Sequence, residues 1–198
     1  TPQDVQGVRG FGVADAAERN VISGNMGSGI YLTGSGNIVA GNYIGVDATG
    51  TAPLGNGVVN AGERDGIAIY SSNNGISSNN RIGTDGNGVA DDAERNVISG
   101  NANNGITINS GNSNVIAGNF VGTNAAGTAA IGNLYAGIGA SGSDNRIGTD
   151  GNGLADAAER NVISGNGGDG IGVGGIGTII AGNFVGTDVN GTARLGNG

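Results

Sequence analysis

The sequence predicts an all-β fold, a right-handed parallel β-helix (solenoid), from three observations. The segment Arg81 to Asn101, RIGTDGNGVADDAERNVISGN, returns 65 positions later from Arg146 with two changes. A shorter motif, Asn-x-(Ile/Val)-x-Gly-Asn, recurs throughout the chain. Aliphatic residues in this motif alternate with small or polar ones, which is the period of a β-strand. Short strands that recur at regular intervals are typical of a solenoid.

The repeats extend over the whole chain. A diverged copy, GFGVADAAERNVISGN, ends at Asn25, and a second block begins at Gly41, Gly118 and Gly182 (GNYIGVDATGTAPLGNG, GNFVGTNAAGTAAIGN and GNFVGTDVNGTARLGNG). We therefore expect residues 1–198 to form a single β-helix domain of nearly three large imperfect repeats, and to be a segment of a longer array.

Strands headed by asparagine are mostly 16 to 18 residues apart, so we expect one coil of two or three strands at each step. The heads of these strands are Asn20, Asn37, Asn80, Asn96, Asn114, Asn145 and Asn161. A short helical reading of ADDAERN lasts two turns at most, and we expect a loop or a single turn there.

Stacked coils should bury a column of aliphatic side chains, because no single coil can bury its own. The residues expected to point inward are Ile22, Val39, Ile82, Ile98, Ile116, Ile147, Ile163 and Ile180. Asparagines that follow glycine at strand ends are expected to stack at one corner as an amide ladder. These are Asn42, Asn101, Asn119, Asn166 and Asn183.

The Asn-x-Ile-x-Gly-Asn coils resemble the parallel β-helix repeats of the pectin-lyase-like superfamily. The blocks NVISGN, GNFVGTD and GTAAIGN look like those of large bacterial surface and secreted repeat proteins. The resemblance implies a secreted or cell-surface location and, as the leading expectation, a non-enzymatic structural or adhesive scaffold that presents a binding surface. The alternative is a polysaccharide-binding or polysaccharide-cleaving protein of the same fold.

The residue inventory weighs against an enzyme. Members of this superfamily that cleave polygalacturonate use a Lys or Arg base near calcium, or an Asp cluster with His, Arg and Lys. The chain has no Lys and no His, and the acidic pair Asp91-Asp92 becomes Asp156-Ala157 in the next copy. An arginine base is the remaining alternative, at the corresponding positions Arg81 and Arg146, but this recurrence favours pairing of each arginine with Asp or Glu on an adjacent coil. We expect no catalytic residue.

One loop collects oxygen donors of the kind that Ca²⁺ prefers. It contains Asp85, Asn87, Asp91, Asp92 and Glu94, and the next copy contains Asp150, Asn152 and Asp156. The spacing does not match an EF-hand, and the first copy has Arg9 and Phe11 at the positions of Asp85 and Asn87. The alternative is a set of tight turns in which Glu94 pairs with Arg95 or a neighbour. No cofactor is required under either interpretation.

Alternation also predicts which strand residues face outward. They are Val21, Ile38, Arg81, Val97, Val115, Arg146, Val162 and Ile179, of which the six aliphatic ones are candidates for an interface. We expect a loop such as Val58 to Asp65, or a neighbouring chain, to cover this stripe. The alternative is that Val and Ile only reflect β-propensity.

The charge limits the classes of partner. With 8 Arg against 16 Asp plus Glu, the formal net charge is −8, which argues against nucleic acid. No apolar run approaches the ~18 residues of a membrane span. Candidate partners are therefore a polysaccharide or a second copy of the chain.

Overall fold

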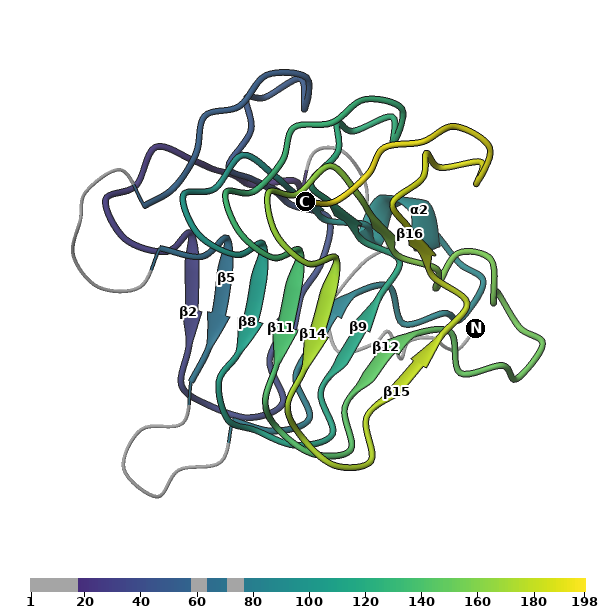
Figure 1. The fold of residues 1–198 in the computed structure, drawn as a ribbon. Helices are drawn as coiled ribbons and strands as arrows, with labels where there is room; N and C mark the ends of the chain where they lie inside the picture. The colour runs from purple at the N-terminus through teal and green to yellow at the C-terminus, as the bar shows by residue number, and fades with distance from the viewer. Residues whose placement is uncertain (1–17, 58–63, 71–76) are drawn as a thin grey trace.

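A computed structural model describes residues 18–57, 64–70 and 77–198, and its strands form three all-parallel sheets. The first sheet contains β1 (Val21–Ile22), β4 (Tyr43–Ile44), β7 (Val97–Ile98), β10 (Phe120–Val121), β13 (Val162–Ile163) and β16 (Phe184–Val185). The second contains β2 (Ile30–Leu32), β5 (Ile67–Ile69), β8 (Ile106–Ile108), β11 (Ile138–Ala140) and β14 (Ile171–Val173). The third contains β3 (Ile38–Val39), β6 (Arg81–Gly83), β9 (Val115–Ala117), β12 (Arg146–Gly148) and β15 (Ile179–Ala181). The chain visits the sheets in strict rotation, which confirms the predicted parallel β-helix (Figure 1).

Short and long coils alternate along the solenoid. The asparagines that precede successive strands of the first sheet are hydrogen-bonded to one another at sequence separations of 22, 54, 23, 42 and 22 residues. A complete short coil therefore takes 22 or 23 residues, and a long coil takes 42 or 54. The 65-residue repeat is one short and one long coil, because 23 + 42 = 65.

The predicted step of 16 to 18 residues for one coil was therefore wrong. Asparagine heads strands of both the first and the third sheet, so a step such as Asn20 to Asn37 leads from one sheet to another within a single coil. Asn20 instead stacks on Asn42, and Asn37 stacks on Asn80.

The core is a column of aliphatic side chains enclosed by the three sheets. Of the residues expected to point inward, Ile82, Ile98, Ile116, Ile147 and Ile163 are fully buried, and Val39 is buried as well. Ile22 is partly buried and Ile180 is half exposed, because they lie on the first and last described strands of their sheets, where no described coil stacks on one side. Alternation thus predicted the direction of these side chains correctly.

Asparagine ladders run along all three corners of the coil, whereas one corner had been expected. In each ladder, the side-chain amide of one coil donates to the side-chain oxygen of the next. The ladder before the first sheet is Asn20, Asn42, Asn96, Asn119, Asn161, Asn183. The ladder after the first sheet is Asn25, Asn56, Asn101, Asn133, Asn166, Asn197. The ladder before the third sheet is Asn37, Asn80, Asn114, Asn145.

A second apolar layer covers the outer face of the first sheet. Strand register aligns Val21, Tyr43, Val97, Phe120, Val162 and Phe184 in one outward row. Hairpins follow the long-coil strands at residues 46–53, 123–130 and 187–194, each closed by an antiparallel bridge, and they project from the same side of the solenoid (Figure 1). Apolar hairpin residues pack against this row.

The predicted outward stripe is consequently two rows on two sheets. Ile38, Arg81, Val115, Arg146 and Ile179 align on the third sheet, whereas Val21, Val97 and Val162 belong to the first. Val97 and Val162 are 3% and 2% exposed beneath the second apolar layer, so the chain itself covers them. Most of the expected covering loop, at residues 58–63, lies outside the described residues.

Hydrogen bonds shape the hairpin turns. The pKa of Asp47 is lowered by the hydroxyl of Thr49 and by main-chain N–H groups of the turn. The pKa of Asp188 is lowered chiefly by the main-chain N–H of Ala193. Asn124 occupies the same position in the second hairpin and accepts the same two main-chain N–H bonds. The turn therefore works with either an amide or a carboxylate.

Candidate functional site: two acidic loops

Two acidic loops, residues 84–95 and 149–160, carry most of the polar residues singled out by sequence. Each loop links the third sheet to the first, leaving β6 or β12 and entering β7 or β13. The first loop contains α2 (Asp91–Glu94), a single helical turn, as expected for ADDAERN. Ala90 and Ala155 precede the turn with φ of 59° and 54°.

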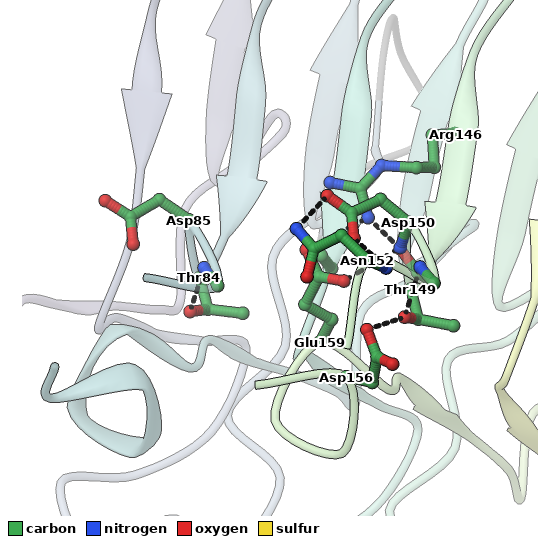
Figure 2. A network of polar contacts seen from close by, with 12 residues as sticks. Thr84, Asp85, Arg146, Thr149, Asp150, Asn152, Asp156 and Glu159 are labelled. Atoms are coloured by element: carbon green, nitrogen blue, oxygen red, sulfur yellow. Dashed lines mark hydrogen bonds and ion pairs between the residues drawn. The ribbon is translucent and has the colours of Figure 1, made fainter. Parts of the chain in front are cut away.

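One carboxylate organises the middle of each loop. Asp91 accepts the hydroxyl of Thr84 at 2.7 Å and the main-chain N–H of Gly88 at 3.0 Å, one on each oxygen. In the second loop, Asp156 accepts the hydroxyl of Thr149 at 2.9 Å and the N–H of Gly153 at 3.2 Å. The two loops are thus held by the same contacts, and Figure 2 shows the second of them.

A second set of hydrogen bonds holds the Asp-Gly-Asn-Gly turns. Asp150 accepts the main-chain N–H of Asn152 and, on its other oxygen, the side-chain amide of Asn152, each at 3.0 Å. The side-chain oxygen of Asn152 then accepts the N–H of Leu154 at 2.6 Å. Asp85 and Asn87 repeat this arrangement in the first loop.

An ion pair closes each loop onto its strand. Arg81 contacts Glu94 at 3.1 Å, and Arg146 contacts Glu159 at 3.1 Å. The arginine pairing was expected, but the partner lies in the following loop rather than on an adjacent coil. Glu94 was expected to pair with Arg95 or a neighbour; its partner is Arg81, whereas Arg95 pairs with Asp92 at 2.6 Å.

The two glutamates differ in burial because the loops stack. The side chain of Glu159 is 2% exposed, against 16% for Glu94. A methyl group added at Gly86 would lie 2.6 Å from Oε1 of Glu159, so the first loop covers the glutamate of the second. Residues 1–17, which contain the first copy of the loop, lie outside the described residues.

The structure brings together only part of the predicted metal-binding set. Ligand atoms of Asp85, Asp91 and Glu94 lie within 4.8 Å of one another, as do those of Asp150, Asp156 and Glu159. Asn87 and Asn152 hydrogen-bond to Asp85 and Asp150, and Asp92 points away into its exposed pair with Arg95. Glu159 was missing from the predicted set, although the 65-residue repeat aligns it with Glu94.

The acidic groups already have donors. The carboxylates of Asp85, Asp91 and Glu94 all accept N–H or O–H hydrogen bonds from the loop itself, and Glu94 is also neutralised by Arg81. A cation entering this loop would have to compete with those donors, which lowers its affinity relative to a set of free carboxylates. The arrangement primarily holds the loop conformation.

The chain matches no protein-family model, no curated protein and no solved structure. Within residues 18–57, 64–70 and 77–198, no helix has the length and apolar character needed to cross a membrane. The geometry described above is therefore the basis for any functional proposal.

Proposed function

We propose that this chain is a non-enzymatic structural segment of a secreted or cell-surface protein, a stiff β-helix of the pectin-lyase-like type that spaces or presents binding surfaces. The observation that carries the proposal is the continuity of the asparagine ladders, two of which run across every described coil. Each rung joins neighbouring coils through side-chain hydrogen bonds, which are buried in the central coils, as in Asn101 with Asn133 at 2.8 Å. Such contacts resist separation of the coils along the axis.

The acidic loops support this proposal over catalysis. Their polar residues form the same contacts in both copies, whereas an active site is usually unique in a chain. Asp91 and Asp156 each accept a threonine hydroxyl and a main-chain N–H, so both oxygens of each carboxylate hold the loop conformation. The recurring residues thus have a structural use.

Single-molecule pulling tests the mechanical part of the proposal. The chain, tethered through its two ends, should keep its folded length until coils separate in discrete steps, and Asn101→Ala should lower the force of those steps. Asn25→Ala is the matched control, since Asn25 is an exposed end rung of the same ladder. Smooth extension at low force in the unmodified chain would refute a stiff spacer.

Polysaccharide binding is a second candidate, favoured by a stacked tyrosine pair on the second sheet. The rings of Tyr31 and Tyr70 lie 5.6 Å apart with an interplanar angle of 19°, and Tyr31 is half exposed. Exposed aromatic faces can stack on sugar rings. Retention of the chain on an insoluble neutral glycan, abolished by Tyr31→Ala, would establish binding, and release of oligosaccharide would overturn the non-enzymatic proposal.

A further inference from the structure

The acidic loops contain two Asn-Gly pairs whose surroundings differ from those of the other described pairs. In Asn87-Gly88 and Asn152-Gly153, the glycine N–H donates to a carboxylate, that of Asp91 or Asp156. In the other described pairs, the glycine N–H donates to a main-chain carbonyl. Those glycines are Gly57, Gly105, Gly167, Gly191 and Gly198.

We propose that Asn87 and Asn152 are sites of intramolecular deamidation promoted by their own loops. The main-chain nitrogen of the following glycine would be the nucleophile, and the side-chain carbonyl carbon of the asparagine would be the electrophile. An Asn-Gly pair is sterically suited to this cyclisation because glycine has no side chain to hinder the attack.

Each reacting group has a suitable neighbour in the first loop. The Gly88 N–H donates to Oδ2 of Asp91 at 3.0 Å, a charge-assisted bond that increases electron density on the nucleophile. The N–H of Val89 donates to Oδ1 of Asn87 at 2.7 Å, which polarises the carbonyl under attack and stabilises the developing oxyanion. Nδ2 of Asn87, the leaving group, donates to Oδ2 of Asp85 at 3.0 Å.

The second loop provides the same set. Gly153 N–H donates to Asp156 at 3.2 Å, Leu154 N–H donates to Oδ1 of Asn152 at 2.6 Å, and Nδ2 of Asn152 donates to Asp150 at 3.0 Å. Asp150 and Asn152 face one another in Figure 2. Both asparagines and their glycines are exposed, so water can reach them for the second step.

The reaction balances with water as the only co-reactant. A bond forms between Gly88 N and Cγ of Asn87, and the bond from Cγ to Nδ2 breaks. The proton of Gly88 N passes through Asp91 to the leaving nitrogen, which departs as ammonia and leaves a succinimide. Water then opens one of the two imide carbonyls, yielding aspartate or isoaspartate at position 87.

The product would weaken the loop. A carboxylate at position 87 cannot donate to Asp85 and places a second negative charge beside it. An isoaspartate also lengthens the main chain by one carbon within a loop that stacks on its neighbour through Gly86. Deamidation would thus loosen the contacts between successive repeats as the protein ages.

Trypsin separates the relevant sites, because Arg81, Arg95, Arg146 and Arg160 place Asn87 and Asn152 in peptides 82–95 and 147–160. After incubation of the folded chain at neutral pH, mass spectrometry of these peptides should show deamidation at both sites at least about tenfold faster than at Asn104 or the exposed Asn190. A tenfold difference in rate is a conservative expectation, because a positioned general base accelerates a reaction by roughly 10²- to 10⁴-fold.

Two variants provide internal controls. Asp91→Asn should slow deamidation at Asn87 by at least about tenfold and leave Asn152 unchanged, and Asp156→Asn should do the reverse. If the faster deamidation of Asn87 and Asn152 in the folded, unmodified chain disappears in urea, the proposal is supported even where a variant fails to fold. Equal rates at all described Asn-Gly pairs in the folded chain, selectivity that persists in urea, or acceleration at Asn87 by Asp91→Asn would overturn it.

Discussion

Replacement of a central ladder asparagine should cost a large part of the stability of this solenoid. Asn101 is 1% exposed, and its Oδ1 accepts the main-chain N–H of Asn56 at 3.3 Å and the side-chain amide of Asn56 at 2.9 Å. Its own amide donates to Oδ1 of Asn133 at 2.8 Å. Asn101→Ala removes these three bonds, together with two further bonds of 3.3 Å from the same amide to the main-chain oxygens of Ile44 and Ser99. The main-chain bonds from Asn101 N–H to Asn133 at 3.1 Å and from Leu134 N–H to Asn101 at 2.9 Å remain.

The expected magnitude follows from these contacts. Each of the three lost bonds within the ladder contributes about 1 kcal/mol net, and a buried N–H of Asn56 left without an acceptor costs roughly 1 to 3 kcal/mol more. The sum is about 4 to 6 kcal/mol, compared with total stabilities of about 5 to 15 kcal/mol for typical domains. Asn25→Ala is the control, because this exposed rung makes one side-chain bond, to Asn56 at 2.8 Å, and should cost about 1 kcal/mol.

Urea unfolding followed by circular dichroism measures both variants, with the m value checked because stacked repeats can unfold in parts. A free energy of unfolding for Asn101→Ala within about 1 kcal/mol of that for Asn25→Ala would refute the reasoning. Coil stacking would then depend on the aliphatic column alone.

Three further outcomes follow from the same contacts. Gly127→Ala should lower the midpoint of thermal unfolding, because Gly127 has φ of 67° and the new methyl group would lie 2.7 Å from Val189 of the next hairpin. Gly139→Ala is the control: its methyl group would have no atom within 4 Å, so the midpoint should stay nearly unchanged. Hydrogen bonds lower the pKa of Asp47 and Asp188 below the ordinary 3.8. The two carboxylates therefore stabilise the fold above pH 3.8, and this stabilisation is lost as the pH falls through their pKa values in the folded state. Asp47→Asn should reduce the acid sensitivity of the melting temperature in a pH series of thermal melts. Calorimetric titration with Ca²⁺ should give weak binding at most, because loop donors occupy the carboxylates, and tight binding lost in Asp150→Asn would contradict that interpretation.

The fold could be predicted because its determinants are local. Alternation assigns the inward residues, and the period of the repeats requires stacked coils. The coil length could not be read in the same way, because asparagine can head two strands of one coil, as Asn96 and Asn114 do in the short coil that contains β7 to β9. Only the pairing of Asn96 with Asn119, rather than with Asn114, shows where one coil ends.

The details of the acidic loops depended on contacts that sequence spacing does not reveal. Sequence reasoning located the loops and most of their acidic residues. It could not show that Glu159 is covered by Gly86 from the preceding large repeat, or that Asp92 points outward to Arg95. These outcomes depend on loop stacking and on the direction of side chains around a single helical turn.

The hairpins, like the acidic loops, occur on the described long coils and contribute to the alternation of short and long coils. Successive hairpins hydrogen-bond directly to one another, through Ala125 N–H to Gly50 at 2.9 Å and Val189 N–H to Gly127 at 2.9 Å, although a short coil lies between the strands from which they emerge. A two-stranded hairpin is about two strand spacings wide, roughly 10 Å, which equals two coils. A hairpin on every coil would therefore have no room.

The same constraint explains the residues beneath the hairpins. Each long-coil strand carries an aromatic ring that lies between a hairpin glycine and an arginine, as Phe120 lies between Gly127 and Arg95, whose guanidinium carbon is 4.5 Å from the ring centroid. Tyr43 and Phe184 have equivalent neighbours. Between the long-coil strands, Val97 and Val162 fill the remaining space below the same hairpin layer, whereas Val21 on the first described strand is 45% exposed. The hairpin layer thus repeats with every second coil, which is the period of the 65-residue sequence repeat.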